Sequence, residues 1–319
     1  AVDDVSRFAF ISRVLVRHGF AEFVVRSGLR SPEKVREDEA AADAAPASDD
    51  PHDTAERLRN ALEELGPTFV KVGQILSTRA DLLPPPFVEE LSKLQDDAPP
   101  MVFDDVKQVV ESGLGDSIDT LFRTFDEEPL ASASMAQTHT AQLRDGTEVV
   151  VKVQRRNIAE TIRSDLDLLH LFARLLEASI REMELYAPGD IVRALDEALS
   201  DETDFRHEAT QLKRFAQLFA DDDAVRAPAV HDALTSSTVL TMERIRGRRI
   251  NDIAPGSEEG EKVALALVEA FYKQIFEHGF FHGDPHPGNL FVEPSGALAF
   301  IDFGLCGQLS VSQRDDLLT

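Results

Sequence analysis

Two short motifs near the end of the chain constrain its fold more than any other feature. Residues 282–289 read His-Gly-Asp-Pro-His-Pro-Gly-Asn, and an Asp-Phe-Gly at 302–304 begins thirteen positions after Asn289. Kinase catalytic loops carry His-x-Asp with an Asn five positions after the Asp, followed later by Asp-Phe-Gly. Asp284 and Asn289 keep this offset. Asp-Phe-Gly alone recurs by chance, but together at this spacing the motifs predict a protein-kinase-like fold.

The same motifs contain the residue types that phosphoryl transfer needs. Asp302 and Asn289 offer hard oxygen donors, so we expect Asp302 to bind Mg²⁺ and Asn289 to bind a second Mg²⁺. Asp284 occupies the position of a catalytic base, which accepts the proton of an attacking hydroxyl or water. The alternative, an Asp-rich turn without a function, explains the combined spacing poorly.

A single lysine interrupts a run of valines at 149–153. A charge inside a buried strand needs an anionic partner, because an unpaired buried charge is costly. Lys152 is therefore the expected counterpart of the kinase lysine on the third strand. Glu208 is the first candidate for its carboxylate partner and Glu202 the second. The alternative is a lysine that extends to solvent from an edge strand.

The loop that should cover the nucleotide contains no glycine. We expect ATP or ADP to be bound by Glu243 together with this loop, which consists of Ala131, Ser132, Ala133, Ser134, Met135, Ala136 and Gln137. Alanine avoids positive φ angles, so the loop cannot copy the close approach of a glycine-rich loop to the phosphates. Either its role is altered or the reaction is weak.

The chain is strongly acidic, with 58 Asp and Glu, 33 Lys and Arg, and a net charge of −25. This balance disfavours nucleic acid as a ligand and favours a surface adapted to high salt over a site for a cationic partner. The single Cys306 excludes an internal disulfide and is more typical of a small core residue than of a reactive thiol. No apolar run of membrane-spanning length and no signal peptide are visible, so a cytoplasmic location is expected.

The pattern along the chain predicts an α+β, protein-kinase-like bilobal fold. Five segments are expected: N-terminal amphipathic helices at 1–30, a flexible acidic linker at 31–53, a helical extension at 54–115, a lobe with a small antiparallel sheet and a helical insert at 116–245, and the start of a helical second lobe at 246–319. A kinase fold needs more helices after Gly304, so we expect this lobe to be truncated and the chain to belong to a longer protein.

Within these segments, period-2 patterns and turn residues predict strands at 122–130, 137–143, 147–154, 229–232 and 238–245, with Asp145-Gly146 as a hairpin turn. Helices are expected at 103–112, 156–183, 188–219 and 258–278. The pattern at 5–30 is helical, apolar on one side and rich in arginine. Two interpretations remain open for it: a helix packed on its own domain and a helix that lies on an anionic membrane surface.

Further motifs make the chain resemble the UbiB family of atypical kinase-like proteins, which is associated with coenzyme Q biosynthesis and isoprenoid-lipid homeostasis. Residues 71–74 match the family's Lys-x-Gly-Gln signature, 131–137 its alanine-rich loop, and 202–204 its Glu-x-Asp motif. The catalytic loop matches the family's wording residue for residue. The resemblance covers the chain from about residue 55 to the end.

The resemblance implies roles for several residues. Lys71 and Gln74 would lie over the active site, with Lys71 paired to Glu202, while Lys152 would pair with Glu208 and reach the phosphates. ATP or ADP and Mg²⁺ are the implied cofactors, because the family is described as having ATPase activity and no established protein substrate. An isoprenoid lipid or quinone precursor, a membrane surface and enzymes of quinone biosynthesis are the implied partners. A membrane anchor would lie beyond Thr319.

Three functional hypotheses follow. The first is a Mg²⁺-dependent ATPase or atypical kinase that supports isoprenoid quinone or membrane-lipid metabolism. The second is a small-molecule kinase of the aminoglycoside or choline type, which shares the catalytic-loop spacing but does not explain the Lys-x-Gly-Gln and Glu-x-Asp motifs. The third is a nucleotide-gated, lipid-binding scaffold with little turnover, against which the intact set of catalytic residues argues.

Overall fold

The computed structural model describes residues 2–42, 50–94, 98–179 and 187–318, which form two compact units. The first unit consists of Ala1–Ala98, Ala133–Met135 and Asn157–Ser200. The second consists of Pro99–Ser132, Ala136–Arg156 and Asp201–Thr319. The tip of the alanine-rich loop therefore belongs to the first unit, although both strands beside it belong to the second.

The first unit is mainly helical in its described residues. Its helices are α1 (Val2–Arg17), α2 (Ala21–Arg26), α3 (Pro32–Ala42), α4 (Pro51–Leu65), α5 (Pro67–Ser77), α6 (Pro85–Leu91), α9 (Ile158–Ser179) and most of α10 (Pro188–Glu202). On α1, Ile11 and Val14 are buried in a core shared with α4, α5 and α9. Arg7 forms two hydrogen bonds, of 2.7 and 2.9 Å, with the buried Asp165. The apolar face of α1 is thus packed inside its own unit, as the first interpretation of residues 5–30 expects.

The predicted linker at 31–53 is wrong for its first part, because Pro32–Ala42 forms α3. Val35 anchors this helix in a small core with Val16, Val24 and Leu29. Val35 and the ion pair of Asp38 with Arg30 hold a helix whose composition is otherwise that of a linker. Residues 43–49 of the predicted linker lie outside the described residues.

The second unit contains a five-stranded antiparallel sheet in the order β1-β3-β4-β6, with β2 also paired to β3. Its strands are β1 (Thr124–Phe125), β2 (Ala131–Ser132), β3 (Ala136–Gln142), β4 (Glu148–Gln154) and β6 (Val239–Glu243). The predicted Asp145-Gly146 hairpin joins β3 to β4, and Gly146 adopts the positive φ of 92° that such a turn requires. The strand predicted at 229–232 is reduced to one bridge, between Val230 and Met242.

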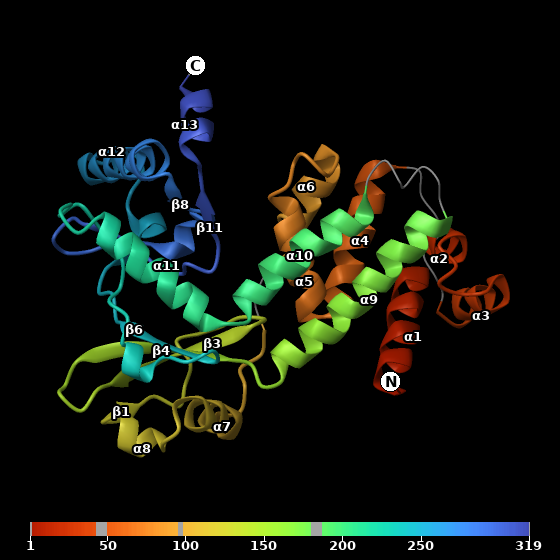
Figure 1. The fold of residues 1–319 in the computed structure, drawn as a ribbon, viewed down its shortest axis with the longest axis horizontal. Coiled ribbons are helices and arrows are strands. Elements are labelled where there is room, and N and C mark those ends of the chain that lie inside the picture. Colours follow the sequence, from red (N-terminus) through yellow and green to blue (C-terminus); the bar gives the residue numbers. More distant parts are fainter. Residues whose placement is uncertain (1, 43–49, 95–97, 180–186, 319) are drawn as a thin grey trace. The chain divides into compact units, whose positions relative to one another are not determined.

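The two faces of this sheet are covered by different helices (Figure 1). They carry different residues, because side chains alternate along each strand. On one face, Val149, Val151 and Val153 pack against α7 (Phe103–Leu114). On the other face, Val150 and Leu240 pack against α11 (Phe205–Leu218). Lys152 therefore points to the α11 face. Because α7 completes this core, it belongs to the sheet unit and not to the predicted extension at 54–115.

Further helices and strands complete the second unit. They are α8 (Ile118–Leu121), β5 (Val225–Arg226), β7 (Arg248–Arg249), α12 (Glu258–Tyr272), a π-helical turn (Lys273–His278), β8 (Phe280–His282), β9 (Leu290–Val292), β10 (Leu298–Phe300), β11 (Cys306–Gln308) and α13 (Val311–Leu317). The single helix predicted at 188–219 is instead two helices, because Asp204 caps the start of α11 through the N–H of Arg206. None of the helices in the described ranges is both long and apolar enough to cross a bilayer.

Candidate active site

Lys152 on β4 lies at the centre of a cluster of charges. Its Nζ is 3.0 and 2.9 Å from the two oxygens of Glu208 and 3.3 Å from Oδ2 of Asp302. Burial disfavours the ammonium, but the attraction of Asp302 and Glu208 outweighs burial and raises the pKa of Lys152 above its ordinary value. The lysine is therefore charged at neutral pH, as contact with phosphate requires.

Glu208 orients this lysine from α11. The carboxylate is buried, and Oε1 also accepts a hydrogen bond of 3.3 Å from the N–H of Phe303. Burial raises the pKa of Glu208, with Lys152 acting against this shift and Asp302 adding to it. Of the two carboxylates predicted as partners of Lys152, Glu208 makes the contact. The capped start of α11 explains this, because it directs the first helical turn towards β4.

Asp302 is held in the position that faces Lys152. Its backbone is left-handed, with φ of 58°, and its Oδ1 accepts a hydrogen bond of 3.3 Å from the N–H of Gly304. The next side chain, Phe303, is fully buried, with its ring centroid 4.9 Å from those of both Phe215 and His282. Phe303 acts as an anchor that turns Asp302 towards the lysine. Left-handed, non-glycine residues of this kind cluster at functional sites.

Asn289 and Asp302 lie at neighbouring ends of two paired strands. Asn289 precedes β9, Asp302 follows β10, and the two strands pair antiparallel with Leu290 opposite Phe300. The N–H of Ile301 donates to the carbonyl of Asn289 at 2.9 Å. Asn289 Nδ2 donates to the carbonyl of Asp284 at 3.3 Å. This hydrogen bond does not involve the amide oxygen, which is the atom that would bind a metal ion. Adjacent strand ends thus bring Asn289 and Asp302 together, and the hydrogen bond from Asn289 keeps the loop residue Asp284 beside them.

A buried network that the sequence prediction missed supports the catalytic loop. His282 Nδ1 accepts from the N–H of Asp284 at 3.2 Å, and Nε2 lies 3.1 Å from the carbonyl of Ile301. Gln274, in the π-helical turn, accepts from the N–H of His282 at 2.9 Å. His282 could have been found as the first residue of the catalytic-loop motif, but no sequence motif indicates Gln274. π-Helical turns are frequent at functional sites.

The donor set fits Mg²⁺ bound together with a nucleotide. Asp302 and Asn289 provide a carboxylate and an amide oxygen, and the carboxylate of Asp302 remains 46% exposed. Within the described ranges, no group of three or more His, Cys, Asp or Glu residues could hold a metal ion. Mg²⁺ commonly takes only one or two carboxylates from a protein, and phosphates and water supply its other ligands.

The alanine-rich loop is packed differently from a phosphate-covering loop. Ala131 and Ser132 form β2, and Ser134 is buried. Met135 is buried in the first unit with Val72 of α5 and Ile162 of α9. No residue of 131–137 has a positive φ, as expected of a loop without glycine. The side chain of Met135 is part of a hydrophobic core.

Gln137 does not reach the nucleotide with its side chain. Thr138 pairs with Lys152, so Thr138 lies on the lysine face of the sheet and Gln137, one residue earlier, lies on the α7 face. The Gln137 amide is 1% exposed and hydrogen-bonded on that face to His139 and to the N–H of Met101. The alternation of strand residues therefore turns this side chain away from the face that carries Lys152, and the predicted nucleotide contact of Gln137 stays a prediction.

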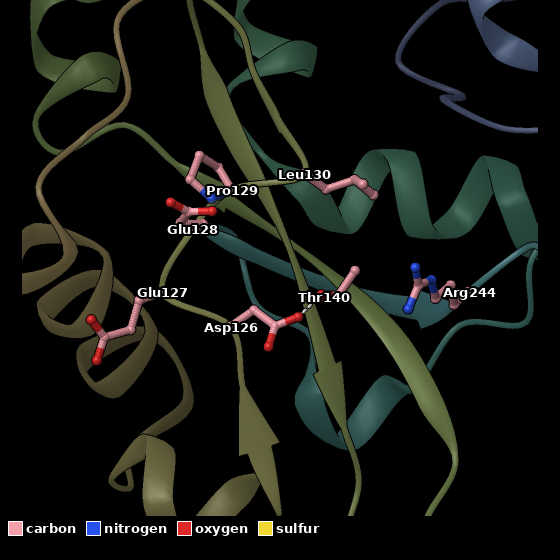
Figure 2. A pocket seen from close by; sticks show the side chains of 7 residues that line it. All are labelled: Asp126, Glu127, Glu128, Pro129, Leu130, Thr140 and Arg244. Carbon is pink, nitrogen blue, oxygen red and sulfur yellow. Dashed lines mark hydrogen bonds between the residues drawn. The ribbon is translucent and has the colours of Figure 1, made fainter.

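A pocket of about 510 Å³ lies beside β3, between segment 126–130 and Arg244 (Figure 2). It is lined by Asp126, Glu127, Glu128, Pro129, Leu130, Thr140 and Arg244. Thr140 is two residues from Thr138 along β3, so the pocket lies on the same face of the sheet as Lys152. Glu243, which was expected to bind nucleotide, directs its carboxylate to Arg226 and to the N–H of Ala229.

Lys71 and Gln74 lie on α5 in the first unit. Gln74 Nε2 donates to the carbonyl of Leu94 at 3.3 Å. The expected functional roles of both residues stay predictions.

The lysine, the buried glutamate and the Asp-Phe-Gly aspartate, together with the loop that carries Asp284 and Asn289, define a protein-kinase-like site on an α+β fold. Residues 93–319 match the model of the ABC1 atypical kinase-like domain. The chain therefore belongs to the ABC1 atypical kinase-like family, and its resemblance to the UbiB group is confirmed.

Individual relatives support this family assignment. The chain is 42% identical over 269 residues to a probable protein kinase UbiB of Marinobacter nauticus, covering 82% of this chain and 49% of that protein. It is 38% identical over 318 residues to an uncharacterized protein in the hydrogenase 1 5′ region of Clostridium pasteurianum, covering 99% and 56%. A solved Rv3197–erythromycin complex from Mycobacterium tuberculosis superposes with a TM-score of 0.59 at 30% identity, covering 82% and 65%. The chain spans about half the length of the curated relatives that it matches.

Proposed function

We propose that the protein binds Mg²⁺–ATP and acts as a slow ATPase or atypical kinase. The observation that carries this proposal is the contact of one charged lysine with both Glu208 and Asp302, under a sheet with a pocket on the same face. Such a lysine neutralises phosphate charge. A pseudokinase that binds no nucleotide has no need to bury this pair, because a buried ion pair adds little stability compared with apolar residues.

Each residue has a distinct task in this proposal. Asp302 and Asn289 hold Mg²⁺, which when bound neutralises the charge of the phosphates. Lys152 binds the α- and β-phosphates, and Glu208 keeps its ammonium in place. Asp284 accepts the proton of the attacking hydroxyl or water. The nucleoside lies towards Leu130 and Thr140, because their pocket is on the lysine side of the sheet.

The biological role that we propose is support of isoprenoid quinone or membrane-lipid metabolism at a membrane surface. The resemblance to the UbiB family supports it, and relatives of the chain carry the UbiB name. The apolar face of α1 is packed in its own unit, so this helix does not provide the membrane contact in the described arrangement. Lys71 and Gln74 are proposed to regulate access to the nucleotide.

The replacement Asp302→Asn tests the metal assignment. It removes a charged Mg²⁺ ligand while preserving the size of the side chain, so we expect the affinity for Mg²⁺–ADP to fall by tenfold or more, about 1.4 kcal/mol. Titration calorimetry with Mg²⁺ and with EDTA separates metal-dependent from metal-independent binding. If the variant retained wild-type Mg²⁺-dependent affinity, the assignment of Asp302 would be wrong.

Asp284→Asn is the matched control, because it makes the same chemical change on the loop that positions the acceptor. We expect it to bind Mg²⁺–ADP normally and to lose ATP hydrolysis, measured as released phosphate with and without vesicles of anionic phospholipid. Hydrolysis that rises with vesicles supports the lipid role. No turnover under any lipid condition would favour the scaffold hypothesis, and fast transfer to a soluble amino alcohol or aminosugar would favour the small-molecule kinase.

A further inference from the structure

A chain of hydrogen bonds runs through the α7 face of the sheet, apart from the phosphate-binding residues. The N–H of Met101 donates to Gln137 Oε1 at 2.7 Å, and Gln137 Nε2 lies 2.9 Å from His139 Nε2. His139 Nδ1 lies 2.7 Å from the carbonyl oxygen of Asp126. The side chains of Gln137 and His139 are 1% and 0% exposed. Because a buried polar group without a partner is costly, such a chain has a sharply defined geometry.

The chemistry of the two ends determines the direction of every bond. The carbonyl of Asp126 can only accept, so His139 carries its proton on Nδ1, and Nε2 accepts from the amide of Gln137. The N–H of Met101 can only donate, so the carboxamide of Gln137 must present its oxygen there. Reversing the carboxamide would break both of its bonds. Burial lowers the pKa of His139, which agrees with the neutral ring that this arrangement needs.

Two aromatic rings also pack beside the imidazole ring of His139. Its centroid lies 5.2 Å from that of Phe125 and 6.5 Å from that of Phe103. With aromatic neighbours and two hydrogen bonds, the ring has a single orientation, and the carbonyl of Asp126 is fixed relative to α7 and β3.

Asp126 transmits this constraint to the pocket on the opposite face. Its N–H donates to the carbonyl of Thr140 at 2.9 Å, and its carboxylate accepts from the hydroxyl of Thr140, as Figure 2 shows. The N–H of Leu130 donates to the carbonyl of Thr138 at 2.7 Å. Residues 126–130 are therefore attached to β3 at both ends, and they form most of the pocket lining.

We propose that Gln137 and His139 are positioning residues for the nucleoside end of the ligand: they hold the carbonyl of Asp126, and through it the segment 126–130 that lines the pocket. The inference rests on the proposed function, since it assigns the pocket to a nucleoside. Neither side chain touches the ligand. Lys152 binds the phosphates and Asp302 holds the Mg²⁺ that neutralises them, whereas the buried chain of hydrogen bonds shapes the wall against which the nucleoside lies.

Two probes separate these tasks: Mg²⁺–ADP, which needs both ends of the site, and Mg²⁺–tripolyphosphate, which needs only the phosphate end. In His139→Leu, the carbonyl of Asp126 loses its donor. We expect the Kd for Mg²⁺–ADP to rise about three- to tenfold, the effect of one lost neutral hydrogen bond. The Kd for Mg²⁺–tripolyphosphate should stay within twofold of wild type. His139→Asn, whose amide can still donate at the position of Nδ1, should recover most of the ADP affinity.

Thr241→Val is the control for a buried polar-to-apolar change in the same sheet, and both Kd values should be unchanged in it. If His139→Leu does not fold, Gln137→Met replaces it, because a side chain of similar volume there frees the ring from its second bond. Equal loss of both ligands, or no loss of ADP affinity in a folded variant, would overturn the inference. A wild-type protein that binds neither probe would instead overturn the proposed function.

Discussion

At the scale of single residues, Cys306 shows how the charges of the site act on a neighbouring group. Burial, together with the carboxylates of Glu208 and Asp302, raises the pKa of the Cys306 thiol to about 12. The thiol also lies 3.7 Å from the carbonyl of Phe303. A thiol with this pKa is protonated at neutral pH and is a poor nucleophile. The sequence prediction of a core-type cysteine agrees with this environment.

We predict that iodoacetamide labels Cys306 in the native protein at pH 8 about two-thousandfold more slowly than in guanidinium, because the thiolate fraction falls from about a quarter to about one in ten thousand. Mass spectrometry of timed samples measures both rates in the same protein. The folded pKa is raised, so stability from this group is full below about pH 8.5 and is lost as pH rises towards 12. Similar labelling rates in the two states would contradict the burial of the thiol.

At this scale, the sequence predicted residues that are identified by a motif, but not the surroundings of residues whose partners lie far away in the chain. The spacing of Asp284, Asn289 and Asp302 identified the catalytic motifs because it depends on the local chain path between two adjacent strands. The environments of Gln137 and Glu243 depend on which face of a strand they occupy and on a distant arginine, Arg226. Those are tertiary properties, and a single sequence does not reveal them.

At the scale of elements, the glycine of the Lys-x-Gly-Gln signature has a packing role of its own. A Cβ at Gly73 on α5 would lie 2.3 Å from Leu94 Cδ1 and 2.9 Å from Leu62 Cδ1, both on buried side chains of the same unit. Glycine therefore lets α5 approach α4 and the segment after α6 closely. This explains Gly73 without reference to the nucleotide.

We predict that Gly73→Ala destabilises the protein by about 1–3 kcal/mol through overpacking, despite the better helix propensity of alanine. Urea unfolding followed by circular dichroism measures the change. Leu94→Ala removes the closest atoms, so the double variant should be more stable than the sum of the single effects predicts. Strict additivity of the two changes would show that α5 does not make this close approach.

Element boundaries were predicted well where a local signal exists and poorly where packing decides. The β3–β4 hairpin follows from Asp145-Gly146, and α7 follows from its amphipathic pattern. In contrast, α3 depends on the docking of Val35. The break between α10 and α11 does have a local signal, the cap formed by Asp204, which the prediction of one helix overlooked. The predicted helix at 258–278 ends in a π-helical turn for which the sequence carries no pattern.

At the scale of the whole molecule, the charge of −25 is the dominant electrostatic feature. Many basic groups are already paired, for example Arg226 with Glu243 and Lys273 with Asp222. Surface pairs of this kind each contribute little. The remaining acidic excess therefore repels itself, and compact folding brings those charges closer together.

We predict that the midpoint of thermal unfolding rises by on the order of 5 °C between 0.1 and 2 M KCl, because the screening length shrinks from about 10 Å to less than 3 Å. Two effects oppose each other here, since salt also weakens the favourable ion pairs. The net charge decides the sign, because unpaired acidic groups outnumber unpaired basic ones. Sucrose at equal osmolality is the control, since it favours compact states without screening charge. If sucrose raised the unfolding midpoint as much as KCl does, the effect would be due to solute exclusion. If KCl lowered the midpoint, the ion pairs would outweigh the acidic excess, and the surface would not be adapted to salt.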